Sequence, residues 1–262
     1  MNLLQNNETD KHTGTRDLLR SNKTDGLSET QDLYEAIFIR RSVRKYNQTA
    51  LDEKTLADIK NFLNNTKQIG GCEACFEFVE SGTVGNGKAP HYILAYCKNE
   101  AAEYINVGYT LQNVDLYLQS KGLGSVWLGM AKPKDTGKRE DYCIMLAFGK
   151  TNVPPRKGAG DFKRLKVSEI SNENNAVAEA ARLAPSAMNT QPYKLNFESG
   201  KITVEYFGRG IMKAIIKKRM GKIDMGIVMR HIQVALENQG KAVTNINIKK
   251  ESKKLYVEIL YT

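Results

Sequence analysis

The chain has 262 residues, 41% of them hydrophobic, and a formal net charge of +10, so it can bury a sizeable core and has a composition ordinary for a globular protein. No uninterrupted apolar run reaches the ~20 residues that crossing a membrane requires, and the first residues lack the apolar core of a signal peptide, so we expect a cytoplasmic protein without a membrane partner. Because the Lys and Arg residues are spread along the chain instead of forming one block, the sequence favours generic surface charge over a nucleic-acid partner.

The first half of the chain predicts alternating helices and strands behind a polar leader. Residues 1–30 show neither a helical nor a strand period, so we expect them to be mobile. The elements expected next are helices at 32–39 and 51–63, strands at 74–80 and 91–97, a long helix at 101–121, and strands at 125–128 and 143–148. The long helix has apolar residues on more than one face, which predicts packing on two sides.

The second half predicts the same succession of elements. They are a helix at 174–183, strands at 194–198 and 201–207, a helix at 223–238, and strands at 242–248 and 255–261. The helix from 223 to 240 (IDMGIVMRHIQVALENQG) echoes residues 105–122 in its Gly, Gln and final Gly. The sequence therefore predicts an internal duplication of a half-domain.

Residues 40–46, RRSVRKY, concentrate hydrogen-bond donors in a short segment. Arg40, Arg41 and Arg44 supply three guanidinium groups, and Ser42 adds a hydroxyl. Such donors can surround a phosphate with charge-assisted, partly bidentate hydrogen bonds. An arginine run can equally be a solvated face, so the segment by itself does not decide between the two interpretations.

Residues 184–192, APSAMNTQP, form the second informative segment. A rigid Pro185 precedes the small Ser186 and Ala187, and Asn189 and Gln191 add side-chain amides. Such a loop lets a flat ligand come close to the backbone, although a plain surface loop has a similar composition.

Together the two segments resemble motifs of the FMN-dependent nitroreductase family, which begins with Arg-x-Ser-x-Arg/Lys and carries Pro-Ser-x-x-Asn-x-Gln-Pro soon afterwards. Residues 105–130 resemble the family's central helix and Gly-Leu-Gly-x-x-Trp turn, and residues 146–157 (LAFGKTNVPPRK) resemble its closing strand and basic tail. The resemblance covers residues 31–262 and implies an α+β, nitroreductase-like fold with mixed sheets flanked by helices.

One departure from the family pattern determines the expected organisation. The first half lacks the proline-serine loop at 61–79, and this loop occurs in the second half instead. We therefore expect one chain to mimic the usual dimer, with a first half at 31–160, a second half at 161–262, and one FMN site between them. A second site is expected to be degenerate because residues 162–170 have charge without the required spacing. The resemblance implies a monomer that acts as a fused dimer, and a further homodimer stays open.

The resemblance also implies the residues of the FMN site. From the first half it implies Arg40, Arg41, Ser42, Arg44, Leu128, Gly129, Arg156 and Lys157, and from the second half Pro185, Ser186, Ala187, Asn189 and Gln191. Arg40, Arg41 and Ser42 would hold the phosphate, whereas Arg44 would reach the pyrimidine edge of the ring. The proline-serine loop would contact the ring and the ribityl chain, and no side chain is expected to act as a catalytic base.

The implied activity is a two-step hydride transfer in which NADH or NADPH reduces FMN, leaves, and is replaced by a small-molecule electron acceptor such as a nitroaromatic or a quinone. Ping-pong kinetics are expected. The alternatives are a flavin-binding carrier or sensor without turnover, another reaction of the same fold, and a basic nucleic-acid-binding module.

The cysteines predict neither a metal site nor a disulfide framework. Cys72 and Cys75 form a lone C-x-x-C, whereas a zinc site needs a second pair or suitably placed histidines. Without a secretory signal, the four cysteines are expected to be free thiols in a reducing compartment.

Overall fold

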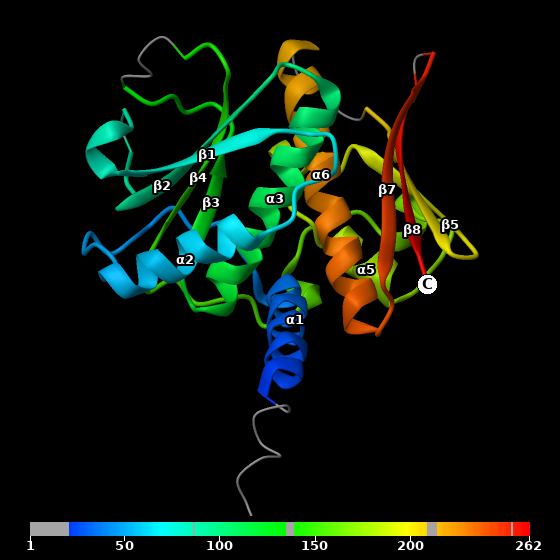
Figure 1. The fold of residues 1–262 in the computed structure, drawn as a ribbon, viewed down its shortest axis with the longest axis horizontal. Helices are drawn as coiled ribbons and strands as arrows, with labels where there is room; N and C mark the ends of the chain where they lie inside the picture. Colours follow the sequence, from blue (N-terminus) through cyan, green and yellow to red (C-terminus); the bar gives the residue numbers. More distant parts are fainter. Residues whose placement is uncertain (1–20, 86, 135–138, 209–213, 253) are drawn as a thin grey trace, which may run out of the picture.

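Two four-stranded sheets flank a central pair of helices, α3 and α6, in the computed structural model of the protein (Figure 1). The structure describes residues 21–85, 87–134, 139–208, 214–252 and 254–262. Its helices and two sheets confirm the expected α+β class and the arrangement in two halves.

The elements of the first half follow the predicted order. They are α1 (Ser21–Ile39), α2 (Glu53–Asn65), β1 (Ala74–Glu80), the 3-10 turn η1 (Ser81–Thr83), β2 (His91–Cys97), α3 (Ala101–Ser120), β3 (Gly124–Leu128) and β4 (Tyr142–Gly149). Helix α2 begins where the Asp52 side chain accepts a hydrogen bond from the amide of Thr55, which caps the first turn.

The second half repeats this succession after a short connection. Its elements are η2 (Ala159–Asp161), α4 (Val167–Ile170), α5 (Ala176–Arg182), η3 (Ala187–Asn189), β5 (Tyr193–Glu198), β6 (Lys201–Tyr206), α6 (Ala214–Asn238), β7 (Val243–Glu251) and β8 (Lys254–Tyr261). In both halves a long helix connects the second strand to the third. The strand orders, β1-β2-β4-β3 and β5-β6-β8-β7, are therefore the same topology repeated.

The sheets differ from the expected mixed type because every pair of neighbouring strands is antiparallel. The connection through α3 makes β2 and β3 run in the same direction, but β4 lies between them. Parallel pairing occurs in the described residues only as isolated bridges, including the bridge between Ser42 and Ser125.

The two central helices approach each other at a pair of glycines. A Cβ at Gly108 of α3 would collide with the carbonyl oxygen of Ile223, and a Cβ at Gly226 of α6 would collide with the carbonyl oxygen of Ile105. These reciprocal contacts relate the two halves by an approximate twofold arrangement. They also explain the echo between residues 105–122 and 223–240 in physical terms, because a side chain at either glycine would force the helices apart.

Two helices begin earlier than the sequence predicts. Helix α1 starts at Ser21, so part of the segment 1–30 expected to be mobile is helical, and residues 1–20 lie outside the described residues. Helix α1 packs against α3 and α6. Helix α6 starts at Ala214 and continues through Gly221. A side chain at position 221 would collide with the Tyr206 ring, since a Cβ there would lie 2.5 Å from it.

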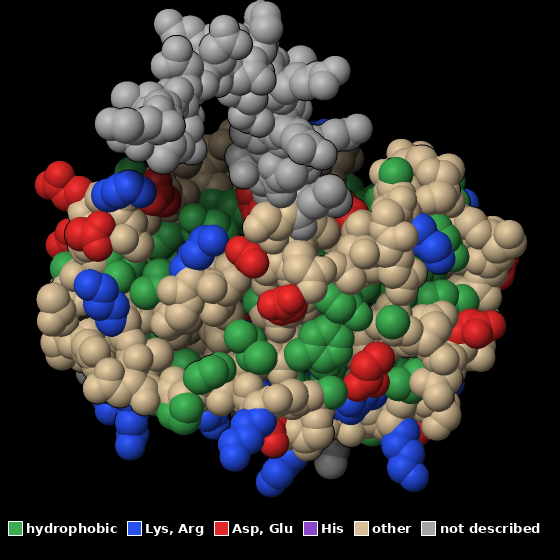
Figure 2. All heavy atoms as spheres, turned by 90° about the horizontal axis from the view of Figure 1, so that it is seen from below, with side chains coloured by type: hydrophobic (Ala, Val, Ile, Leu, Met, Phe, Trp, Pro, Cys, Tyr) green, Lys and Arg blue, Asp and Glu red, His purple; other side chains and the backbone are tan. Residues whose placement is uncertain are grey.

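One hydrophobic core joins both halves, since buried residues of α1, α3, α5, α6 and both sheets belong to a single contact cluster. On the face seen from below, Lys and Arg side chains are scattered with Asp and Glu among them (Figure 2). Within the described ranges, no helix has both the length and the apolar character that membrane crossing requires.

Candidate functional site

The two segments that the sequence singles out meet at a cavity of about 490 Å³ between the halves. Its first-half lining is Ser42, Arg44, Trp127, Gly129, Met130 and Ile144, and its second-half lining is Pro185, Ser186, Ala187, Met188, Met220, Ile223, Asp224 and Ile227. The volume lies in the range typical of small-molecule and cofactor sites. The wall is mainly apolar, and Arg44 brings a positive charge to it.

Arg44 is the exposed cation of this wall. It makes no hydrogen bond or ion pair with the part of the chain that the structure describes, and it lies near Tyr46, whose pKa it lowers against the stronger effect of burial. Its guanidinium donors are therefore available to an anionic or carbonyl-bearing ligand.

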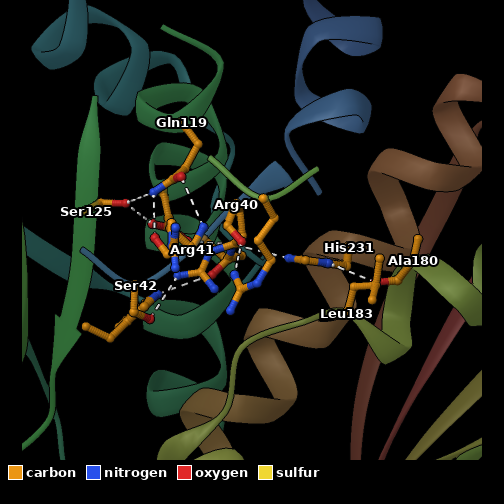
Figure 3. Close-up of polar contacts among 12 residues, drawn as sticks. Arg40, Arg41, Ser42, Gln119, Ser125, Ala180, Leu183 and His231 are labelled. Carbon is orange, nitrogen blue, oxygen red and sulfur yellow. Dashed lines mark hydrogen bonds and ion pairs between the residues drawn. The ribbon is translucent and has the colours of Figure 1, made fainter. Parts of the chain in front are cut away.

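Arg40, in contrast, lies beneath the cavity wall. Its side chain is 1% exposed, and its Nε lies 2.7 Å from Oδ2 of Asp115, a residue of α3 (Figure 3). A second donor, Nη2, reaches Oγ of Ser42 at 3.4 Å. The sequence suggested three guanidinium groups open to a phosphate, but the acid that pairs with Arg40 comes 75 residues later and is invisible to local spacing.

Arg41 is also anchored to the protein. Its backbone N–H and C=O bond the side-chain amide of Gln119, and its Nη1 donates to the carbonyl of Pro154 over 2.7 Å (Figure 3). The segment around Arg40 and Arg41 is thus held by α3 on one side and by the tail after β4 on the other.

The basic tail folds back onto this segment. The Arg156 amide donates to the carbonyl of Ile39 over 2.9 Å, and the Arg156 guanidinium donates to the carbonyl of Arg40. Burial and the neighbouring Arg40 and Arg41 lower the pKa of Arg156. Lys157 is exposed, and its backbone amide bonds Asp161. Arg156 therefore lies next to the arginine segment.

A further arginine in this region was not predicted to belong to the site. Arg164 donates to the side-chain oxygen of Asn189 and, over 3.4 Å, to the carbonyl of Leu183, while its Nε is buried without a hydrogen-bond partner among the described residues. Burial lowers the pKa of Arg164 to about 10, and the nearby Arg40 and Arg156 act in the same direction. The spacing of residues 162–170 gave no sign that Arg164 approaches the proline-serine loop.

The proline-serine loop is fixed by hydrogen bonds on both sides. The amide of Ala187 donates to Oδ1 and Oδ2 of Asp224, at 3.0 and 3.2 Å, and Oγ of Ser186 accepts from the amide of Gln191. Met188, Asn189 and Gln191 have φ values of 51°, 57° and 44°, in the left-handed region that costs energy for residues other than glycine. The loop is thus held in a defined and strained conformation beside the cavity.

Asn189 and Gln191 support this loop instead of lining the cavity. The amide nitrogen of Asn189 donates to the carbonyl of Lys163. Gln191 is buried, accepts from the amide of Leu165 and donates to the carbonyl of Arg182. From the sequence, both residues are expected in the FMN site. In the structure they belong to the loop, but their side chains bond other segments of the chain instead of lining the cavity.

Leu128, the last residue of β3, and Gly129, which follows it, lie in different environments. Gly129 lines the cavity, where a Cβ would lie 2.8 Å from the sulfur of Met220. Leu128 packs on the smaller hydrophobic cluster, which includes Tyr92 and Met145, and does not line the cavity.

Several cavity residues were not predicted from the sequence as site residues. They are Trp127, Met130, Ile144, Met188, Met220, Ile223, Asp224 and Ile227. The indole N–H of Trp127 donates to Gln112 of α3, which also bonds Asp115, so the cavity wall and the Arg40 ion pair share one network. Trp127 could have been found as the single tryptophan of the Gly-Leu-Gly-x-x-Trp turn.

The cysteines lie apart from this cavity. Cys72, Cys75, Cys97 and Cys143 are free, and burial raises the pKa of Cys72, which makes its thiol less reactive. The described ranges contain no group of three or more His, Cys, Asp or Glu residues that could bind a metal ion.

The two equivalent antiparallel sheets and the long helices between them form a nitroreductase-like α+β fold. The chain belongs to the family described as "Putative TM nitroreductase", whose family model matches residues 32–236.

A solved structure that matches this chain over most of its length supports the fold. A nitroreductase-type protein from Thermotoga maritima MSB8 is 20% identical, with a TM-score of 0.64 over 87% of this chain and 93% of that one. Another from Desulfovibrio desulfuricans, in complex with FMN, is 20% identical, with a TM-score of 0.43 over 55% of this chain and 96% of that one. A nitroreductase family protein from Clostridium difficile 630 is 16% identical, with a TM-score of 0.45 over 55% of this chain and 98% of that one. No curated protein matches the chain.

Proposed function

We propose that the protein is an FMN-dependent oxidoreductase that transfers hydride from NADH or NADPH to a nitroaromatic, a quinone or a similar acceptor. The observation that carries this proposal is the joint cavity, in which Ser42 and Arg44 of the first half face Pro185, Ser186 and Ala187 of the second. Membership of the nitroreductase family supports the same class of chemistry.

The residues present suit a flavin. The apolar side chains of Trp127, Ile223 and Ile227 offer contacts to a flat aromatic ring, and Arg44 offers donors to its polar edge. Arg156 lies close to Arg40 and Arg41, Arg164 lies close to Arg40 and Arg156, and the buried Nε of Arg164 lacks a partner in the described chain. This cluster of positive charge favours an anion such as a phosphate nearby.

Bound FMN would supply the hydride chemistry, and the chain would supply position and electrostatics. Arg44 would stabilise negative charge on the ligand in the cavity, and the fixed loop at Pro185–Ala187 would orient the ring against the opposite wall. The donor and the acceptor would bind in turn at the open face, which predicts ping-pong kinetics.

We further propose that the chain divides near residue 160 and holds one FMN. Two halves related as the subunits of a dimer would give two sites, but the proline-serine loop belongs to the second half only. The corresponding first-half loop, residues 66–72, has neither the proline nor the serine.

Reconstitution with FMN tests the proposal. The purified protein is loaded with FMN, its visible spectrum is recorded, the released flavin is counted per chain, and NADH and NADPH are then added without oxygen. We expect one FMN per chain that loses its visible absorbance on addition of reductant. Bound FMN that neither nucleotide reduces would favour the carrier or sensor function, and failure to bind FMN would overturn the proposal.

A further inference from the structure

At one pair of equivalent positions, the two central helices carry different side chains, an amide in α3 and a carboxyl in α6. Asn106 of α3 and Asp224 of α6 each lie two residues before the glycine at which the helices meet. Each accepts a hydrogen bond from a loop amide: Asn106 from Ile69 at 2.9 Å, and Asp224 from Ala187 at 3.0 Å. The first half therefore shows that an amide side chain is sufficient to anchor such a loop.

The carboxyl group of Asp224 has a property that the amide lacks, namely that it can carry and release a proton. It lines the cavity, whereas Asn106 does not, and it is only 3% exposed. No cation forms an ion pair with it within the described segments. A carboxylate so placed would be a poorly compensated buried charge.

The surroundings favour the neutral, protonated form of this carboxyl. Burial raises its pKa to about 8, against the opposing effects of the Ala187 amide and of Arg164. The other titratable or charged groups that face it are Tyr206 of β6, whose own pKa is raised by burial and by Asp224, and Arg44 across the cavity. Both oxygens lie within hydrogen-bond distance of the Ala187 amide, so one can accept from it while the other holds the proton.

We propose that Asp224 is the proton donor of the cavity and gives an electron acceptor the proton that it needs alongside a hydride. This inference rests on the proposed function and adds a catalytic residue to it. A quinone that receives a hydride, derived from NAD(P)H through the bound cofactor, gains two electrons and one proton. The Oδ–H bond of Asp224 then breaks, its proton joins the anionic oxygen to complete the hydroquinone, and water returns a proton to the carboxylate.

The kinetic test follows the acceptor step alone. Protein loaded with FMN and reduced by NADH is mixed with a naphthoquinone, and the rate of reoxidation is measured from about pH 6 to about pH 10. For the natural chain we expect the rate to fall roughly tenfold per unit above the pKa of Asp224. In Asp224→Asn we expect a rate at neutral pH lower by roughly 100-fold and no such fall.

Two comparisons separate proton donation from loop anchoring. Asp224→Asn keeps an acceptor for the Ala187 amide, as Asn106 does for Ile69, so its affinity for FMN should stay within roughly threefold of the natural chain. Tyr206→Phe removes the neighbouring titratable group, which does not itself line the cavity, and it should keep the pH profile of the natural chain. An unchanged rate and profile in Asp224→Asn would overturn the inference.

A measurement on the protein without cofactor gives an independent readout. The infrared carbonyl band of a protonated carboxyl should be present at neutral pH, disappear as the pH rises through about 8, and be missing in Asp224→Asn. Absence of this band at neutral pH in the natural chain would overturn the inference even if the enzyme were active. If the natural chain bound no FMN, the proposed function would fail and the catalytic role with it, whereas the band would still report whether Asp224 holds a proton.

Discussion

Arg40 and Asp115 form an ion pair from which water is excluded, with 2.7 Å between Nε and Oδ2 and side chains that are 1% and 0% exposed. Asp115 also accepts hydrogen bonds from Ser125 and Gln112, so its charge is shared among donors of β3 and α3. The pair fixes the start of the arginine segment against the central helix. Arg44, four residues later, is left to face the cavity.

The first prediction concerns this ion pair. Arg40→Ala should lower the free energy of unfolding by about 3–5 kcal/mol, because it leaves the carboxylate of Asp115 buried without its cation. Urea denaturation followed by circular dichroism measures the change. Arg41→Ala is the control, since Arg41 is half-buried and forms no ion pair in the described chain, and it should cost about 1 kcal/mol or less. Equal losses in the two variants would contradict a special role for the buried pair.

The second prediction concerns the contact of α3 with α6. Gly226→Ala should lower the free energy of unfolding by about 3 kcal/mol, because its methyl group would meet the Ile105 carbonyl, a backbone atom that cannot move aside without separating the helices. Gly160→Ala is the control, because a Cβ there meets nothing within 4 Å. If the two variants had the same denaturation midpoint, the helices would not need the close approach.

The third prediction concerns Arg44 and the proposed cofactor. Arg44→Ala should weaken FMN binding by roughly tenfold or more, because a charge-assisted hydrogen bond is lost, and it should leave the unfolding free energy within about 0.5 kcal/mol. Quenching of FMN fluorescence measures the affinity. Lys45→Ala removes a neighbouring exposed charge that does not line the cavity, so it should bind FMN as the natural chain does. An equal loss in both variants would point to general charge attraction instead of a contact.

Much of the fold could be predicted because the relevant signals are local. The strand expected at residues 91–97 and the long helix expected at residues 101–121 correspond to β2 and α3 nearly residue for residue. The internal duplication could be predicted because residues 105–122 around Gly108 resemble residues 223–240 around Gly226. What sequence periodicity could not supply was the strand order, since the insertion of β4 between β2 and β3 depends on contacts between distant segments.

The site was predicted less completely for the same reason. Ser42, Arg44, Gly129, Pro185, Ser186 and Ala187 do line one cavity, but Arg40, Asn189 and Gln191 have partners that only the tertiary structure provides. Asp224 was overlooked because a single carboxyl within a helix carries no local sign of burial. The comparison of Asn106 with Asp224 could have drawn attention to it, since the two stand at equivalent positions of the repeated helices.

The last prediction concerns His231, which α6 buries against α3 and α5. Its Nδ1–H donates to the carbonyl of Ala180 over 2.9 Å, and its Nε2 accepts from the amide of Gln112 over 3.2 Å (Figure 3). The bond from Gln112 requires the neutral ring, because a protonated Nε2 cannot accept a hydrogen bond. Burial lowers the pKa of His231 from 6.5 to about 3, against the opposing effect of the bond to Ala180. Between these values the unfolded chain binds a proton that the folded chain does not, so the stability supplied by neutral His231 is present above pH 6.5 and is lost as the pH falls towards 3.

His231→Gln should therefore flatten the dependence of stability on pH. As the pH falls below 6.5, the free energy of unfolding should decrease more steeply for the natural chain than for the variant, by up to ~1.4 kcal/mol per pH unit. Urea denaturation at a series of pH values measures the difference between the two curves. Asn113→Ala is the control, because Asn113 occupies the equivalent buried position of α3 and has no titrating group, so it should lower stability by the same amount at every pH. Curves for the natural chain and His231→Gln that run parallel through this range would show that protonation of His231 does not oppose folding.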